Sequence, residues 1–192
     1  MKTIKRFPVI ILFVLTACHT AQNAQTAFRV NQVSTDARGN EMLLGKCTKD
    51  ALLKPPFSVW FLKNYNDYTG DLKAIDSLRP LLKNKKVTIF LGTWCGDSKR
   101  EVPRMLKILD GCGFPEKQAR LIMVSNLTGM YKQSPQHEEA GKNIIRVPTF
   151  IFYENGKEMG RIIESPVLSL EKDMLKILRK ENYVPHYNTG RS

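Results

Sequence analysis

One short stretch of the chain carries residues suited to nucleophilic chemistry. The segment Gly92-Thr93-Trp94-Cys95-Gly96-Asp97-Ser98 follows the apolar run from Lys86 to Gly92 and precedes apolar residues at helical spacing. Cys95 is therefore expected at the first turn of a helix, where unpaired backbone N–H groups and the helix dipole stabilise a thiolate. A cysteine in that position is a candidate nucleophile near neutral pH.

A second pattern lies further along the chain. In Arg146-Val147-Pro148-Thr149 a proline directly precedes an apolar strand pattern, and a cis peptide bond at such a place forms a deliberate turn. The sequence therefore predicts a cis bond before Pro148.

The pattern around these segments predicts alternating strands and helices. Apolar runs and alternation indicate strands near 28–33, 41–45, 86–92, 120–125, 149–153 and 157–163, the last two joined by a turn at Asn155-Gly156. Helical spacing is found across 57–68, 71–82, 102–109 and 170–178. Pro80 is expected to kink or break the second helix.

Together these features resemble the thioredoxin superfamily, especially the membrane-anchored and periplasmic thioredoxin-like proteins of bacteria. The resemblance covers about Lys85 to Glu181. It rests on WCGDS in place of WCxxC, Pro103 at the kink-proline position, and Val147-Pro148-Thr149 as the cis-proline loop. It implies an α/β thioredoxin-like fold with a central mixed sheet flanked by helices. Residues 27–84 would form an N-terminal extension with the first helices, 85–183 the core and 184–192 a tail.

The chain departs from the family pattern within this motif. Ser98 stands where the family has its second cysteine, so Cys95 cannot close a disulfide within the motif. Ile89 occupies the position of the acid that thioredoxins bury beneath the site. The charge of Asp97 is expected to raise the pKa of Cys95, and Lys99 would offset this in part.

The resemblance implies a monothiol thiol-disulfide oxidoreductase, a reductase or an isomerase, in which Cys95 forms a mixed disulfide with its substrate. Ser98 would donate a hydrogen bond to the thiolate. Trp94, Val147 and Pro148 would contact the substrate, and the Val147 backbone would pair with an extended segment. The alternative is a non-catalytic binding or chaperone-like module that uses the groove beside Pro148.

The partners of an enzyme of this kind are a disulfide-containing or thiol-bearing protein and a second thiol that releases it. That thiol would come from the substrate, from a small thiol or partner reductase, or from Cys47 or Cys112. A structural disulfide between Cys47 and Cys112 is a further open possibility. No cofactor is expected, since the chain lacks a phosphate-binding glycine-rich loop.

The N-terminus resembles a bacterial lipoprotein signal. Residues 1–17 combine three cations with an apolar run shorter than the roughly 20 residues that span a membrane. Leu15-Thr16-Ala17-Cys18 resembles a lipobox, so Cys18 would carry the lipid and 18–26 would form a tether. An ordinary secretory signal is the alternative. The lipoprotein reading predicts a protein anchored in the bacterial cell envelope and facing the periplasm, with the outer membrane favoured because His19 is not acidic.

Charge and histidine content exclude other classes of function. The net charge of +12 falls to +9 once the three signal cations are removed, since 27 basic residues then face 18 acidic ones. These cations are scattered, which favours a solvated surface over nucleic-acid binding. His19, His137 and His186 lack metal-ligand spacing. His137 with Glu138 and Glu139 indicates a solvated face.

Overall fold

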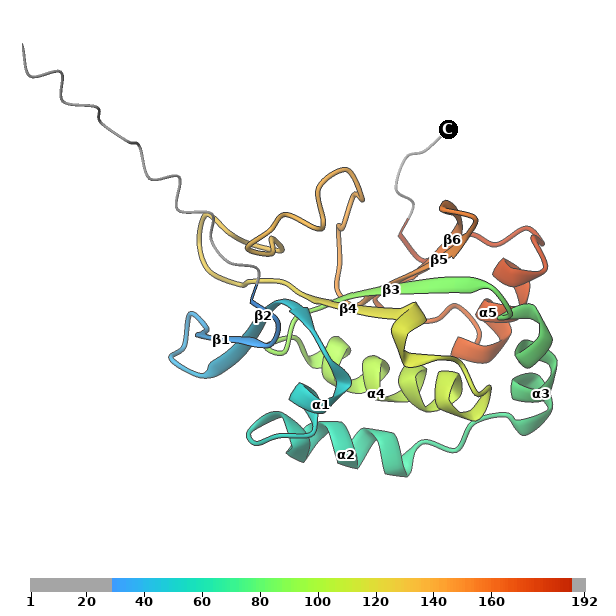
Figure 1. Cartoon of the computed structure of the whole chain (residues 1–192), viewed down its shortest axis with the longest axis horizontal. Coiled ribbons are helices and arrows are strands. Elements are labelled where there is room, and N and C mark those ends of the chain that lie inside the picture. Colours follow the sequence, from blue (N-terminus) through green and yellow to red (C-terminus); the bar gives the residue numbers. More distant parts are fainter. Residues whose placement is uncertain (1–28, 188–192) are drawn as a thin grey trace, which may run out of the picture.

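The computed structural model describes residues 29–187, which fold around one six-stranded mixed sheet (Figure 1). In order across the sheet the strands are β1 (Gln32–Thr35), β2 (Glu41–Cys47), β4 (Ala119–Met123), β3 (Lys85–Leu91), β5 (Thr149–Glu154) and β6 (Lys157–Ile163). The helices are α1 (Lys49–Leu52), α2 (Phe57–Asp67), α3 (Leu72–Leu81), α4 (Gly96–Gly111) and α5 (Leu170–Leu178), with a 3-10 turn at Glu116–Gln118.

The centre of the sheet is β3, which pairs parallel with β4 and antiparallel with β5. Parallel strands require a crossover connection, and α4 supplies it between β3 and β4. All residues from Val87 to Leu91 are buried, as expected for a continuous apolar strand covered on both faces. The expected α/β architecture with a mixed sheet is confirmed.

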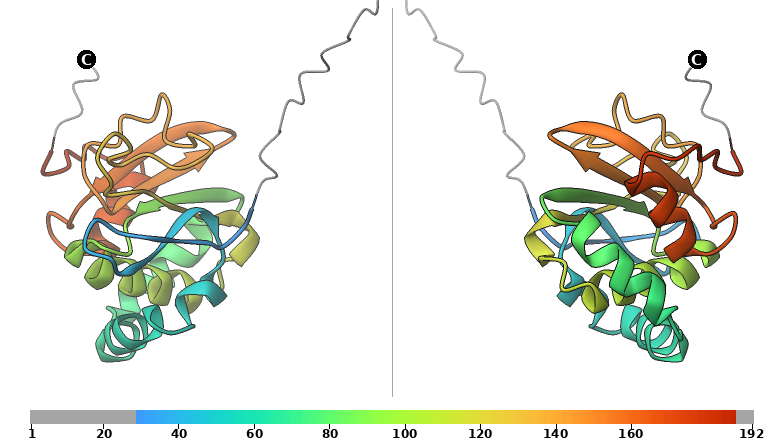
Figure 2. Two further views of the ribbon diagram at one scale, coloured as in Figure 1. Left: turned by 90° about the vertical axis from the view of Figure 1, so that its left-hand side faces the viewer. Right: turned by 90° about the vertical axis from the view of Figure 1, so that its right-hand side faces the viewer.

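The two faces of the sheet are covered differently. The larger core packs the sheet against the helices, with Ile89 and Phe150 meeting Met105 of α4 in a fully buried cluster. A smaller cluster on the opposite side includes Phe90 and Ile122. In Figure 2 the long segment between β4 and β5 lies over this opposite side, while the helices lie beneath the sheet.

Polar contacts fix that long segment. The fully buried Ser134 lies with its Oγ 2.6 Å from Glu138 Oε2 and 2.5 Å from Glu139 Oε2, and this Oγ accepts a hydrogen bond from the Glu138 N–H. The side chain of Glu139 is only 12% exposed. The predicted solvated face is therefore wrong for Glu139, although His137 beside it is 64% exposed.

Two local expectations are corrected, and one short helix was not predicted. The first strand lies at Gln32–Thr35 rather than at 28–33. Pro80 does not break α3, because it lies in the last turn and Leu82 N still donates to Leu78 O at 3.0 Å. The short α1 was not predicted, since its four residues are too few for a periodic pattern.

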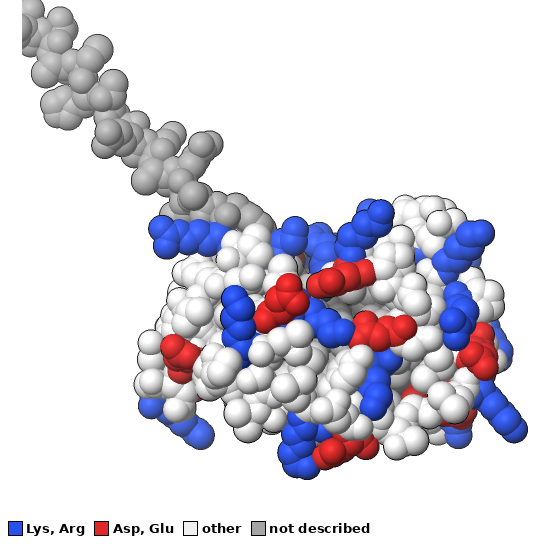
Figure 3. Space-filling model, turned by 60° about the horizontal axis from the view of Figure 1, so that its bottom comes forward, with Lys and Arg blue, Asp and Glu red and all other residues white. Residues whose placement is uncertain are grey.

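The segments expected to form the signal, the tether and the lipidated Cys18 lie outside the described residues, as does the end of the tail after Tyr187. Within 29–187 no helix has both the length and the apolar character needed to cross a membrane. Acidic and basic side chains are interspersed over the face shown in Figure 3.

Replacing Ser134 with Ala removes the hydroxyl that organises this segment and leaves the Glu138 N–H without its acceptor. We expect the free energy of unfolding to fall by about 1–3 kcal/mol, measured by urea titration. Ser77→Ala is the matched control, because Ser77 is exposed on α3 and its change should stay within about 0.5 kcal/mol. Equal losses of stability in Ser134→Ala and Ser77→Ala would contradict the role of the Ser134 hydroxyl in organising this segment.

Candidate active site around Cys95

Cys95 is the N-cap residue of α4. Its N–H donates to Gly92 O at 2.9 Å, and its carbonyl accepts the first helical bond from Lys99 N at 3.0 Å. No side chain caps this end of the helix, so the N–H groups of the first turn have no side-chain acceptor. The partly exposed cysteine thus sits at the positive end of a helix of 16 residues.

The Cys95 sulfur faces the loop that precedes β5. Its Sγ donates to Val147 O across 3.2 Å, and the Val147-Pro148 peptide bond is cis, as predicted. The Val147 side chain is buried against Phe90 and Ile151, so the residue offers the site its carbonyl rather than its side chain.

Trp94 forms one side of the site. Its Nε1 donates to Val124 O at 2.8 Å, and its ring lies 5.9 Å from that of Tyr131, centroid to centroid. Gly92 makes room for this ring, because a Cβ there would come within 2.5 Å of Trp94 Cε2. The sequence analysis named Trp94 but missed Tyr131, which lies in a segment without helical or strand periodicity.

Ser98 is fully buried, and its side chain points toward the end of β3. Its Oγ accepts a hydrogen bond from Gly92 N at 3.2 Å. The described contacts contain no hydrogen bond between Ser98 and Cys95, so the expected donation to the thiolate is not made in this state. The hydroxyl instead joins the start of α4 to the strand before it.

Arg100 is the residue that balances Asp97. Its Nη2 lies 2.7 Å from Asp97 Oδ1, and its Nε lies 2.6 Å from Oε1 of the buried Glu101. The sequence analysis named Lys99 and not Arg100 as a partial offset to Asp97; Lys99 lines a polar cavity of about 410 Å³ beside Trp94, and its effect on Cys95 stays a prediction. The spacing of three between Asp97 and Arg100 is a helical ion-pair signal that could have identified the pair.

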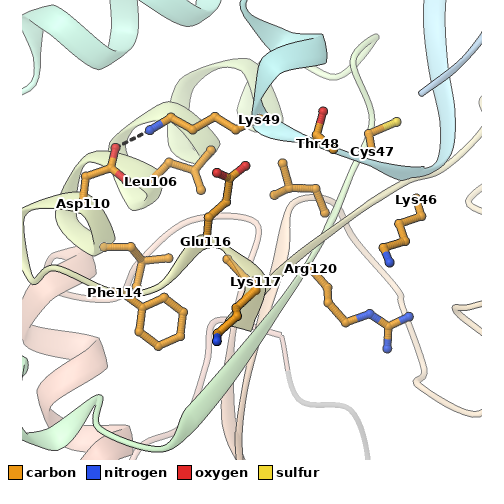
Figure 4. Close-up of a pocket in the computed structure, with 13 residues that line it drawn as sticks. Lys46, Cys47, Thr48, Lys49, Leu106, Asp110, Phe114, Glu116, Lys117 and Arg120 are labelled. Atoms are coloured by element: carbon orange, nitrogen blue, oxygen red, sulfur yellow. Dashed lines mark hydrogen bonds and ion pairs between the residues drawn. The ribbon is translucent and has the colours of Figure 1, made fainter. Parts of the chain in front are cut away.

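Cys47 and Cys112 form no disulfide in the structure and are both buried. Cys47 is one of the residues that line a cavity of about 520 Å³ (Figure 4). Lys49 and Asp110 form an ion pair on one side of this cavity. Cys112 caps the far end of α4 and borders a different cavity. Burial raises the pKa of Cys47 to about 12 and that of Cys112 to about 11.

In the part of the chain that the structure describes, no three His, Cys, Asp or Glu side chains are grouped to hold a metal ion. Around Cys95 the structure places the Val147 carbonyl 3.2 Å from the sulfur, and the adjacent Trp94 ring lies 5.9 Å from that of Tyr131.

Comparison with known proteins gives relatives of one kind. Mitochondrial thioredoxin-3 of Saccharomyces cerevisiae is 27% identical over 133 residues, which cover 68% of this chain and 96% of that protein. Thioredoxin-like protein R548 of Acanthamoeba polyphaga mimivirus is 27% identical over 92 residues, or 45% of this chain and 58% of that one. The chain has a thioredoxin-like fold. The relatives' names support its place in the thioredoxin superfamily.

Two solved structures align with part of this chain. The crystal structure of oxidised S. cerevisiae mitochondrial thioredoxin 3 aligns with a TM-score of 0.34 and 24% identity, covering 59% of this chain and 98% of that one. A protein of unknown function from Pseudomonas aeruginosa aligns with a TM-score of 0.38 and 12% identity, covering 64% and 80%. No family profile matches the chain.

Gly92→Ala should displace the Trp94 ring, because the added methyl group overlaps it. We expect the indole N–H resonance of Trp94 to shift in NMR spectra and the free energy of unfolding to fall by about 1–3 kcal/mol. Gly96→Ala is the control, since a Cβ at Gly96 meets no atom within 4 Å. An unchanged Trp94 resonance in Gly92→Ala would show that the close approach is not required.

The native protein should react with iodoacetamide at Cys95 and not at Cys47 or Cys112 at pH 7.5. The reactive species is the thiolate, and burial with raised pKa values keeps the other two thiols protonated until the pH approaches about 11 to 12. Peptide mapping by mass spectrometry measures the three sites, and denatured protein provides the reference. Modification of all three at equal rates in the native state would contradict the burial of Cys47 and Cys112.

Proposed function

We propose that this protein is a monothiol thiol-disulfide oxidoreductase of the bacterial cell envelope, with Cys95 as the nucleophile. The observation that carries the proposal is the placement of a partly exposed Cys95 at an uncapped helix N-terminus, with its sulfur 3.2 Å from Val147 O. Cys47 and Cys112, the other described cysteines, are buried. The thioredoxin names of the relatives support a thiol redox function on thiol-bearing proteins.

The first step is a thiol-disulfide exchange. The Cys95 thiol gives its proton to solvent, and the thiolate attacks one sulfur of the substrate disulfide in line with the S–S bond. A bond forms between Cys95 Sγ and that sulfur, while the old disulfide bond breaks and its second sulfur leaves as a thiolate. The substrate is thereby held as a mixed disulfide.

Ionisation of Cys95 also changes the role of Val147. In the resting state the thiol donates a hydrogen bond to Val147 O, whereas a thiolate has no hydrogen to donate. The carbonyl is then free to accept from the backbone N–H of an extended substrate segment, which would lie beside Pro148 as an added strand. Ionisation of Cys95 thus removes its hydrogen bond to Val147 O and leaves this carbonyl to the substrate. Activation of the sulfur and binding of the substrate are coupled in this way.

Release of the mixed disulfide needs a thiol from outside the motif. Ser98 has no sulfur, and Cys47 and Cys112 are buried at the sides of other cavities. A thiol of the substrate gives isomerisation, while a small thiol or a partner reductase gives net reduction of the substrate.

The proposed location rests on the sequence of the first 26 residues. Cleavage before Cys18 and lipidation of that cysteine would anchor the domain through a short tether, with the fold facing the periplasm. The outer membrane is the favoured destination, since His19 is not an acidic retention residue.

Two substitutions and one control variant test the catalytic proposal. Cys95→Ala should reduce turnover of a protein disulfide to the uncatalysed level, while Cys112→Ala, a buried cysteine remote from the reaction, should retain it. Ser98→Cys adds the missing second thiol, so turnover should depend less on an added small thiol. Reduction of insulin in the presence of glutathione measures all three.

The binding-module alternative gives a different result. A wild-type protein that shows no turnover with any thiol, and whose Cys95 alkylates no faster than free cysteine, would contradict the enzyme. The groove beside Pro148 would then be the functional surface.

A further inference from the structure

We propose that the segment after α5 completes the substrate-binding face, with the Tyr187 ring as a wall that selects polypeptides carrying an apolar side chain next to their cysteine. This inference rests on the proposed function and assigns a substrate preference to the same site. It concerns a residue outside the thioredoxin-like core, in the stretch that sequence reasoning predicted to be only a tail.

Tyr187 lies against the residue that precedes Val147. The guanidinium carbon of Arg146 lies 5.0 Å from the centroid of the Tyr187 ring. Glu164 lies beside both, because its Oε1 lies 3.7 Å from Arg146 Nη1 and its side chain raises the pKa of the Tyr187 hydroxyl. The Glu164 N–H also donates to Pro148 O at 2.7 Å. Tyr187 is thus linked through two residues to the loop that faces the Cys95 sulfur.

The path of the segment is fixed at several points. Helix α5 is followed by Lys180 in the left-handed region, with φ of 59°, which turns the chain back toward the sheet. The Tyr183 hydroxyl donates to the buried Asp173 at 2.9 Å, and His186 Nε2 lies 3.1 Å from Pro166 O. Figure 1 shows the segment rising from α5 past β5 and β6. These contacts hold the segment as an ordered part of the domain.

The site therefore has aromatic rings on two sides. Trp94 is tied to the end of β4 through Val124 O, and Tyr131 lies beside it with 57% of its surface exposed. Tyr187 lies against Arg146, which pairs with Glu164, the residue that follows β6. Because β3 and β5 lie between β4 and β6, the site that follows β3 and precedes β5 has one wall on each side.

This arrangement favours an extended polypeptide over a small disulfide. A strand that pairs with Val147 advances about 3.3 Å per residue, so its neighbouring side chains reach beyond the reacting sulfur toward the flanking rings. Aromatic walls contribute affinity by covering apolar side chains, and tyrosine is frequent among the residues that dominate binding. A small disulfide engages Cys95 without reaching a distant wall.

The test compares two substrates on the full chain. One is a short peptide with a phenylalanine beside its disulfide-bonded cysteine, and the other is 5,5′-dithiobis(2-nitrobenzoic acid). Tyr187→Ala should lower the ratio of kcat/KM for the peptide to kcat/KM for the small disulfide by roughly tenfold, mainly through the peptide KM. Asn182→Ala, an exposed position in the same segment, should leave this ratio unchanged.

Tyr187→Phe separates binding from support of the loop. It keeps the ring and loses the hydroxyl beside Glu164, so it should retain the wild-type ratio to within about twofold if the ring contacts substrate. A ratio that stays constant in Tyr187→Ala, or that falls equally in Tyr187→Ala and Tyr187→Phe, would overturn the proposal.

A binding measurement keeps the inference independent of turnover. Fluorescence anisotropy of the labelled peptide with Cys95→Ala protein, with and without Tyr187→Ala, reports non-covalent affinity. We expect the second substitution to weaken binding roughly tenfold, and less for a peptide with glycine in place of phenylalanine. Equal affinities would overturn the proposal, whereas absent turnover with retained peptide binding would overturn only the enzymatic function.

Discussion

The pairing of β3 with β5 is the constraint on which the site depends. Phe90 pairs with Thr149 in this antiparallel register, so the residues just after β3 and just before β5 emerge at the same edge of the sheet. Cys95 and Val147 are 52 positions apart in the chain, yet this register leaves sulfur and carbonyl 3.2 Å apart. A slip of one residue would turn the side chains of β5 to the opposite face and bury the wrong ones. The extensive burial of both strands therefore holds the register and the reacting geometry together.

The helical layer supports one half of the site and an irregular segment supports the other. Helix α4 carries Cys95 and packs on the larger core, so the position of the sulfur is set by regular structure. The segment that precedes Val147 has no helix or strand and depends on Ser134, Glu138 and Glu139 for its shape. The Cys95 sulfur is thus positioned by the apolar packing of α4, whereas Val147 combines an apolar side-chain contact with a preceding segment that polar contacts hold. Substitutions in the apolar core should therefore displace Cys95, whereas substitutions of Ser134, Glu138 or Glu139 should affect the segment before Val147.

The sequence was sufficient to predict most of the fold and the position of Cys95 at the start of a helix, because these depend on local patterns. The apolar run of β3, the turn at Asn155-Gly156 and the cis bond before Pro148 each have a short-range physical signal. The direction of the Ser98 side chain has none, since it depends on how the end of β3 lies over α4. The contact between Tyr187 and Arg146 likewise joins residues that are close only after the segment following α5 has folded back.

Cys47 and Cys112, unlike Cys95, are protected from oxidation only by their burial in the folded chain. Neither is part of the proposed chemistry, and both are hidden from solvent only while the core around them is closed. In an oxidising medium the rate at which this protein folds therefore competes with the rate at which its thiols react. When the core opens, either thiol can be oxidised. The modified side chain no longer fits the core, so the chain cannot refold and local opening becomes irreversible. In such a medium the lifetime of the protein is then set by how often its core opens, independently of the reactivity of Cys95.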